Sequence, residues 1–147
     1  MSILRFLSPS LLIAVSIQLL CQLFKVIYYS IKSRNLQLHR FMHPAGMPSA
    51  HSAFVTALSV SIGIHNGFAS ELFALAFVFS VIIIYDSIRL RGAVQRNSQI
   101  IARLMHLIPE SERVDVPRYV GHSLAEIIVG MIVGGLWAFL ATLMIGQ

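Results

Sequence analysis

Four long apolar segments follow one another along the chain, at about residues 9–31, 49–64, 71–88 and 119–145. A helix that crosses a bilayer needs about 20 predominantly apolar residues, so this pattern predicts about four transmembrane helices. The second segment is short and carries four hydroxyl side chains, those of Ser52, Thr56, Ser59 and Ser61. Such a segment is typical of a partial or buried helix rather than of one that faces lipid.

The stretch after the third segment has a different pattern. Five apolar residues share one helical face: Leu90, Val94, Ile101, Leu104 and Ile108. Three arginines recur every seven residues on another face: Arg89, Arg96 and Arg103. Apolar and basic residues on separate faces predict an amphipathic helix that lies at the membrane interface, near anionic headgroups. For Arg96 and Arg103 we favour an anchoring role over a catalytic one.

The composition agrees with an all-α polytopic membrane helix bundle. The chain has 147 residues, of which only 12% are charged, against about 25% in ordinary soluble domains. Its mean hydropathy is +0.78. We expect one integral membrane domain over residues 1–147, with the first segment retained as a helix rather than removed as a signal peptide. A homodimer is compatible with so thin a bundle.

Basic residues occupy alternate connections between the segments. Lys32, Arg34 and Arg40 lie between the first and second, six arginines lie between the third and fourth, and residues 65–70 contain none. With four spans, the two basic connections fall on the same side, which the positive-inside rule makes cytoplasmic. We expect the inner (cytoplasmic) membrane of a bacterium, with that face inside. The same cations would also suit a polyanionic substrate, so both explanations stay open.

Alternation of the spans also brings the chemically interesting residues to one membrane face. They are Lys25 and Lys32 at the end of the first segment, Pro48-Ser49-Ala50-His51 at the start of the second, Asp86 and Arg91 at the end of the third, and His122 and Glu126 at the start of the fourth. This coincidence is the strongest topological argument for a shared site.

His122 and Glu126 stand four residues apart, which places them on one face of a helix. A carboxylate beside an imidazole orients it and makes it a better nucleophile. Taken alone, the pair is equally well explained as a structural ion pair, and His51 as a histidine satisfied at a helix start. His39 and His43 have metal-ligand spacing on a helix, but Pro44 and the loop context argue against a metal site.

Phosphoryl transfer is the chemistry that this set of groups fits. Its transition state carries negative charge on the equatorial oxygens, so lysine and arginine can hold it. A helix that starts at Ser49 would add free backbone N–H groups as an anion site. Two histidines can then divide the work, one as nucleophile and the other as acid for the leaving alkoxide.

Three motifs resemble the divergent type 2 phosphatidic acid phosphatase family, which is related to acid phosphatases and vanadium-dependent haloperoxidases. They are Gly-Met-Pro-Ser-Ala-His-Ser-Ala at 46–53, Tyr-Asp-Ser at 85–87 with Arg91, and Gly-His-Ser-x-x-Glu at 121–126. The resemblance implies that His51 is the general acid, His122 the nucleophile and Glu126 the group that orients it. It further implies phosphate binding by Lys25, Lys32, Ser49 and Arg91, with Asp86 in a supporting role through pairing with Arg89 or Arg91.

The chain departs from the superfamily signature in ways that concern the phosphate clamp. Ala50 replaces a glycine, Glu126 replaces an aspartate, and Val116 stands where an arginine precedes the nucleophilic histidine. Arg91 or Arg118 could replace that arginine. Lys32 or Arg40 could serve as the second cation of the first motif.

The resemblance implies a membrane-embedded phosphatase that uses neither a metal nor a cofactor. It would hydrolyse a lipid phosphate, such as phosphatidate or phosphatidylglycerol phosphate, or an isoprenyl (di)phosphate, through a phosphohistidine intermediate. The expected partners are that substrate and membrane lipids, not nucleic acid. Two alternatives remain, a non-catalytic phospholipid-binding or scaffold protein and a small proton-coupled transporter that uses His122, Glu126 and Asp86 as a relay.

Overall fold

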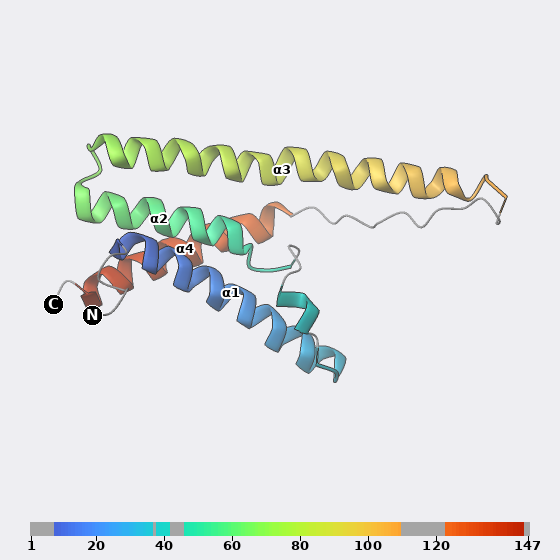
Figure 1. The fold of residues 1–147 in the computed structure, drawn as a ribbon, viewed down its shortest axis with the longest axis horizontal. Coiled ribbons are helices and arrows are strands. Elements are labelled where there is room, and N and C mark those ends of the chain that lie inside the picture. Colours follow the sequence, from blue (N-terminus) through green and yellow to red (C-terminus); the bar gives the residue numbers. More distant parts are fainter. Residues whose placement is uncertain (1–7, 37, 42–45, 110–122, 146–147) are drawn as a thin grey trace.

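The structure, a computed structural model, describes residues 8–36, 38–41, 46–109 and 123–145, and its regular elements there are all helices. They are α1 (Pro9–Ser33), the short 3-10 helix η2 (Leu38–Phe41), α2 (Ala50–Asn66), α3 (Glu71–Met105) and α4 (Leu124–Ile145) (Figure 1). Three of these, α1, α3 and α4, are long and apolar enough to cross a membrane. The predicted all-α membrane helix bundle is therefore confirmed.

Serine begins each of the long helices. The hydroxyls of Ser8, Ser49 and Ser70 accept hydrogen bonds from backbone N–H groups in the first turns of α1, α2 and α3. A capping hydroxyl satisfies one of the backbone donors that a helix leaves unpaired at its N-terminus. These caps fix the helix starts at or within one residue of the positions that the apolar pattern predicts.

Successive long helices run in opposite directions. In Figure 1, α1 and α3 run from left to right, while α2 and α4 return from right to left. The ends of α1 and α3 and the starts of α2 and α4 therefore lie toward the same end of the bundle. This is the alternation on which the predicted shared membrane face depends.

The helix α2 lies at the centre and packs against α1, α3 and α4. Its buried residues are almost all small, namely Ala50, Ser52, Ala53, Val55, Ala57, Ser59, Ser61 and Gly63. Small side chains let neighbouring helix backbones approach closely inside a membrane. Hydroxyls join the helices, since Ser59 Oγ lies 2.7 Å from Ser80 Oγ and Ser80 Oγ donates to the Val55 carbonyl at 3.0 Å. The second segment is thus the buried helix that its hydroxyls predict.

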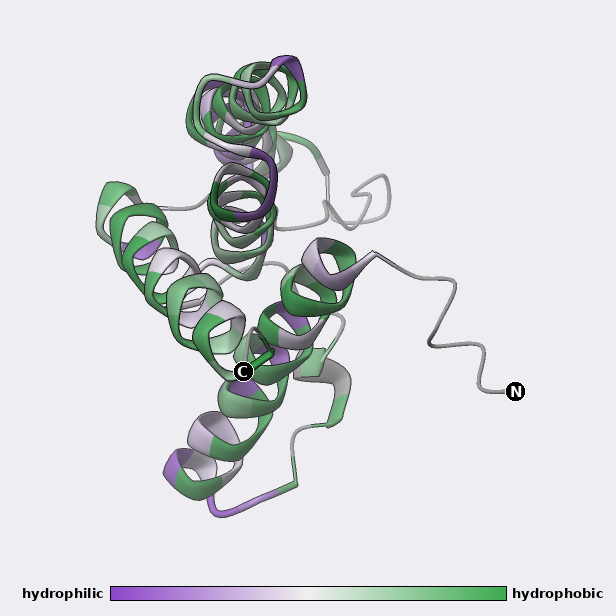
Figure 2. Cartoon of the chain, turned by 90° about the vertical axis from the view of Figure 1, so that its left-hand side faces the viewer, coloured by the Kyte–Doolittle hydropathy of each residue, from purple (hydrophilic) through white to green (hydrophobic). Residues whose placement is uncertain are grey.

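Two glycines bring α4 against α2. A Cβ atom at Gly130 would lie 2.5 Å from the Ser49 carbonyl oxygen, and one at Gly134 would overlap the backbone of Ala53. The four-residue spacing places both glycines on one face, so the two backbones touch along a full turn. The outer surfaces carry mainly hydrophobic residues (Figure 2), as a lipid-facing bundle requires.

One element differs from its sequence prediction. The third apolar segment and the basic amphipathic stretch after it form a single helix, α3, of 35 residues. At 1.5 Å per residue this helix is about 52 Å long, whereas the hydrocarbon core of a bilayer is about 30 Å thick. The amphipathic stretch is helical, as expected, but it continues a spanning helix instead of turning onto the interface (Figure 1).

Candidate functional site

A backbone hydrogen bond holds the starts of α2 and α4 side by side. The backbone N–H of Ser49 donates to the carbonyl of Glu126 at 3.0 Å. The Ser49 hydroxyl accepts from the N–H of Ser52 at 3.4 Å, and the Ser123 hydroxyl accepts from the N–H of Glu126 at 3.3 Å. Two helix N-termini, each with a partial positive charge, therefore meet at one place.

Ser123 caps the last helix. Its hydroxyl accepts from the Glu126 N–H, and α4 begins at Leu124. The expected helix start near residue 119 is therefore wrong, because Ser123 is the cap. The argument that put His122 and Glu126 on one helical face loses its basis, and His122 itself lies outside the described residues.

Lys25 is the most unusual residue near this junction. It lies in α1 and is 1% exposed, and its ammonium has no hydrogen-bond partner among the described residues. The carboxylate of Glu126 is near enough for its charge to act on this ammonium. Desolvating an ion costs several kcal/mol in proteins, so a buried cation inside a membrane helix indicates a functional site.

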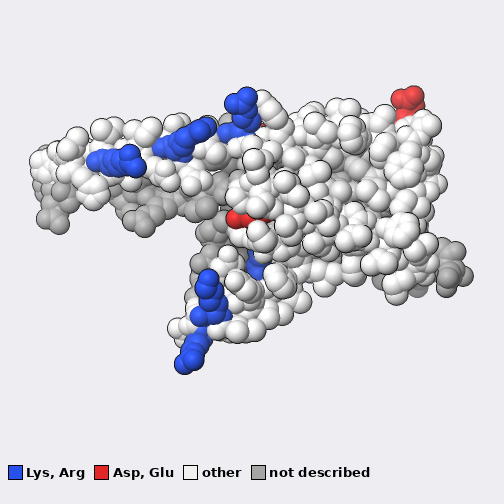
Figure 3. Space-filling model, turned by 180° about the vertical axis from the view of Figure 1, so that it is seen from behind, with Lys and Arg blue, Asp and Glu red and all other residues white. Residues whose placement is uncertain are grey.

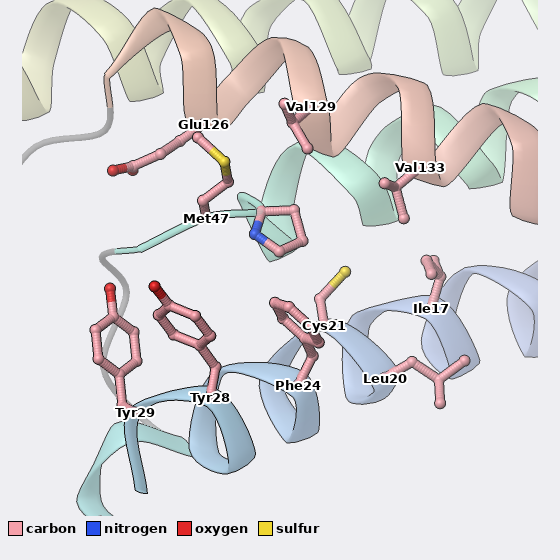
Figure 4. A pocket seen from close by; sticks show the side chains of 11 residues that line it. Ile17, Leu20, Cys21, Phe24, Tyr28, Tyr29, Met47, Glu126, Val129 and Val133 are labelled. Atoms are coloured by element: carbon pink, nitrogen blue, oxygen red, sulfur yellow. The ribbon is translucent and has the colours of Figure 1, made fainter. Parts of the chain in front are cut away.

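A cavity of about 840 Å³ lies between α1 and α4. Its lining residues are Ile17, Leu20, Cys21, Phe24, Tyr28, Tyr29, Met47, Pro48, Glu126, Val129 and Val133. Figure 4 shows the Glu126 carboxylate and the two tyrosine hydroxyls at one end, and Ile17, Leu20 and Val133 toward the other. The cavity is therefore amphipathic, with a polar end and an apolar body.

Lys25 stands in α1 between residues that line this cavity, although Lys25 itself is not one of the lining residues. Cys21, Lys25 and Tyr29 follow one another at four-residue spacing along α1, so they share a face. Cys21 and Tyr29 line the cavity. Lys25 therefore belongs to the helix face that forms this wall.

His51 is the second residue of α2 and is partly buried. Because it follows the Ser49 cap by two residues, it belongs to the junction where α2 meets α4. The structure therefore joins two of the predicted site residues directly, Ser49 and Glu126, and places His51 two residues after Ser49.

Other predicted site residues lie away from this junction or outside the described part. Lys32 is exposed two turns beyond Lys25, with its ammonium 6.0 Å from the centre of the Tyr28 ring. Asp86 is exposed on α3 and forms no ion pair among the described side chains, while Arg89 lies over the Tyr85 ring at 5.8 Å. Arg91 is in α3, but its side chain and that of Arg40 lie outside the described part, as does Arg118.

The distribution of charge is polarised along the molecule. Figure 3 shows the lysines and arginines gathered at the end where α1 and α3 terminate. This end also holds the starts of α2 and α4. Within the described residues, no cluster of three or more His, Cys, Asp or Glu side chains has a geometry that could hold a metal ion.

Sequence reasoning missed the walls of the cavity. Phe24, Tyr28 and Tyr29 come from α1, whereas Val129 and Val133 come from α4 about 100 residues later. The signal that was available is the spacing of Cys21, Lys25, Tyr28 and Tyr29, which puts polar groups on one side of an apolar helix. The partner face on α4 cannot be read from that spacing.

Fold and site together define a small helical membrane protein with a buried lysine in α1 and an amphipathic cavity between α1 and α4. The chain belongs to the divergent PAP2 family, whose model matches residues 6–137. It is therefore a membrane protein related to phosphatases. It is 35% identical over 95 residues to YuiD of Bacillus subtilis (strain 168), described as an uncharacterized membrane protein. That match covers 65% of this chain and 60% of the relative's length. No solved structure matches the chain.

Proposed function

We propose that this protein is a membrane-embedded phosphatase that releases phosphate from a lipid phosphate or an isoprenyl (di)phosphate. The observation that carries the proposal is Lys25, a buried cation with no hydrogen-bond partner among the described residues. The same helix, α1, supplies Cys21, Tyr28 and Tyr29 to one wall of an apolar cavity whose other wall includes Glu126, in the first turn of α4. An anion attached to a hydrocarbon chain matches this arrangement better than a free anion or an uncharged lipid.

The substrate would be held by both of its parts. Its phosphate would meet the Lys25 ammonium and the backbone N–H groups at the start of α2, where Ser49 is the cap. Its hydrocarbon chain would occupy the apolar body of the cavity, between Phe24 on α1 and Val133 on α4. Lys32 and Arg91 would contribute positive charge from the surrounding rim.

The chemistry would proceed in two balanced steps. A nitrogen of His122 attacks phosphorus, the bond from phosphorus to the lipid oxygen breaks, and His51 donates a proton to the departing alkoxide. His51 then accepts a proton from water as that water attacks phosphorus. The phosphorus–nitrogen bond breaks, which releases inorganic phosphate and restores His122. Glu126 would orient His122 and stabilise its positive charge, and Asp86 would support the cationic rim.

Phosphate release by the purified full chain tests this proposal. We expect metal-free release from a panel of lipid phosphates, with orthovanadate as a competitor, and a loss of at least about 100-fold in the variants His51→Ala and His122→Ala. His65→Ala is the matched control, because His65 lies at the other end of α2 and its Nδ1 is 2.8 Å from the Ser61 carbonyl oxygen. Undiminished turnover in His122→Ala would rule the mechanism out.

A non-catalytic phospholipid-binding protein is the second candidate. The Ser123 cap favours it, because capping accounts for one residue of the last motif without any catalysis. Both candidates require anion binding by Lys25. The two candidates differ in what the histidine variants should do. A binding protein would retain its lipid-phosphate affinity in His51→Ala and His122→Ala. It would show no hydrolysis with or without these substitutions.

A further inference from the structure

The polar end of the cavity is continuous with the start of α2. Pro48, which precedes the Ser49 cap, lines the cavity, and so does Glu126. The Ser49 N–H donates to the Glu126 carbonyl at 3.0 Å, so Glu126 belongs both to the cavity wall and to the junction of the two helix starts. A phosphate bound by backbone N–H groups at the start of α2 would therefore lie next to whatever occupies the polar end of the cavity.

This polar end offers hydrogen-bonding groups of both kinds. Figure 4 shows the Glu126 carboxylate there, together with the hydroxyls of Tyr28 and Tyr29. An ionised carboxylate only accepts hydrogen bonds and has several acceptor positions on its two oxygens, whereas a phenol both donates and accepts. A ligand hydroxyl is itself a donor and an acceptor. It therefore finds a partner at this end for each of its two roles.

Charge restricts what can occupy the polar end. Among the described lining residues only Glu126 carries a formal charge. An anionic group there would face this carboxylate with no lysine or arginine in the described wall. A cationic group would compete with the Lys25 ammonium, whose charge acts on the same carboxylate. Burying an unbalanced charge costs far more than burying a hydrogen-bonded hydroxyl. The phosphate of a substrate therefore belongs at the start of α2, and an uncharged hydrogen-bond donor belongs at Glu126.

The apolar body of the cavity extends along α1 for the length of a lipid chain. Tyr29 lies at the polar end and Ile17 toward the other. They are separated by about 18 Å of helix, and one leaflet of a hydrocarbon core is about 15 Å thick. Just past Ile17 and Val133 the two helices meet, because Trp137 Nε1 donates to Ser16 Oγ at 2.9 Å. A chain in the cavity would therefore end near Trp137.

We propose that the substrate is a lipid phosphate with a free hydroxyl group beside its phosphate, as in the phosphate ester of a monoacylated glycerol. The hydroxyl donates to Glu126 and accepts from Tyr28, while the chain follows α1 toward Trp137. This inference rests on the proposed function and narrows its choice of substrates. An isoprenyl phosphate has no such hydroxyl, and a site built to hydrogen-bond a hydroxyl rejects an analogue that lacks it.

Trp137 is the single tryptophan of the chain, so its fluorescence can report binding without turnover. In phosphatidylcholine proteoliposomes that contain the full-length His122→Ala protein, a monoacylglycerol phosphate with bromine at the end of its chain should quench Trp137 saturably, because bromine quenches tryptophan on contact. The unbrominated lipid should reverse the quenching. Its O-methyl ether, which lacks the hydroxyl, and farnesyl phosphate should each require at least about ten times the concentration.

Two further substitutions assign this preference to the polar end. The ratio of the affinities for the hydroxyl lipid and for its methyl ether isolates the hydroxyl contact, because both lipids carry the same phosphate and chain. We expect Glu126→Met to bring this ratio to within about twofold of unity, and Tyr28→Phe to lower it at least about threefold. Tyr85→Phe is the matched control and should leave the ratio unchanged, since Tyr85 is an exposed residue of α3 whose ring lies beside Arg89.

Failure of this inference and failure of the proposed function give different results. Equal displacement by the hydroxyl lipid, its methyl ether and farnesyl phosphate would overturn the inference, whether or not the unmodified protein releases phosphate. Quenching that does not saturate would do the same, since lipid would then reach Trp137 only from the bilayer. A preference of about tenfold in a protein that releases no phosphate would support the binding assignment and reject the phosphatase.

Discussion

At the scale of a single residue, Lys25 shows a conflict between the stability of the protein and its capacity to bind an anion. Its ammonium has left water without gaining a hydrogen-bond partner among the described residues, although the Glu126 carboxylate is nearby. Replacing a poorly compensated buried ion by an apolar residue of similar volume is often neutral or stabilising. A lysine kept for binding should therefore lower the stability of the protein that contains it.

We expect Lys25→Met to raise the free energy of unfolding by about 1–3 kcal/mol and to abolish vanadate or lipid-phosphate binding. Thermal unfolding in detergent and a binding titration measure the two effects. Lys32→Met is the control for the stability measurement, because that exposed side chain should change the free energy of unfolding by no more than about 0.5 kcal/mol. A destabilised Lys25→Met protein would mean that the ammonium has a structural partner.

The sequence identifies Lys25 as a candidate but cannot reveal its burial. Burial depends on how α1 meets α2 and α4, and the i to i+4 spacing along one helix contains no such information. For His122 the difficulty is the helix boundary. The sequence analysis placed His122 and Glu126 on one helical face, but the helix begins after Ser123. A capping serine inside an apolar segment was the signal that could have placed this boundary.

At the scale of the elements, the contact between α2 and α4 depends on two glycines that have no room for a side chain. The adjacent Gly135 is different, since a Cβ atom there would meet Thr56 Cγ2 at 3.9 Å. A side chain therefore fits at Gly135 but not at Gly134. Alanine variants at these two neighbouring positions test how closely α4 packs against α2.

Gly134→Ala should destabilise the protein by about 1–3 kcal/mol, because the added methyl group would overlap the Ala53 backbone and force α4 away from α2. Gly135→Ala should be neutral or stabilising by up to about 1 kcal/mol, since alanine favours a helix over glycine. Circular dichroism melting curves of the two variants compare them directly. If both substitutions are tolerated equally, the helices do not approach as closely as described here.

Helix starts and the buried character of α2 are predictable from capping serines and from the hydroxyls inside a short apolar segment. The length of α3 is not, because hydropathy falls where the arginines begin although the backbone continues as a helix. An amphipathic pattern identifies the face of a helix, but it does not fix the angle between that helix and the segment before it.

At the scale of the whole molecule, the alternation of the helices fixes which segments share a side. The connection of α1 to α2 and the C-terminal half of α3 should lie on one side of the membrane, and Gly67, in the connection of α2 to α3, on the other. From the positive-inside rule we expect the first side to be cytoplasmic, and labelling can test that expectation.

In sealed vesicles of known orientation, a membrane-impermeant maleimide should label Asn35→Cys and Arg103→Cys from one side and Gly67→Cys from the opposite side. All three positions are exposed, and the buried Cys21 should be replaced by alanine first. Labelling of Arg103→Cys and Gly67→Cys from the same side would contradict the arrangement of α3 as a spanning helix.

The shortness of α2 has a consequence for where any headgroup must sit. Its 17 residues span about 25 Å, which is about 5 Å less than the hydrocarbon thickness of an average bilayer. The tight connection of residues 67–70 joins its far end to the start of α3, so the Ser49 end is the one that falls short. Because α2 packs against α1, α3 and α4, this shortfall lies inside the bundle. A headgroup that reaches Ser49 should therefore enter between those helices, below the plane of the neighbouring headgroups.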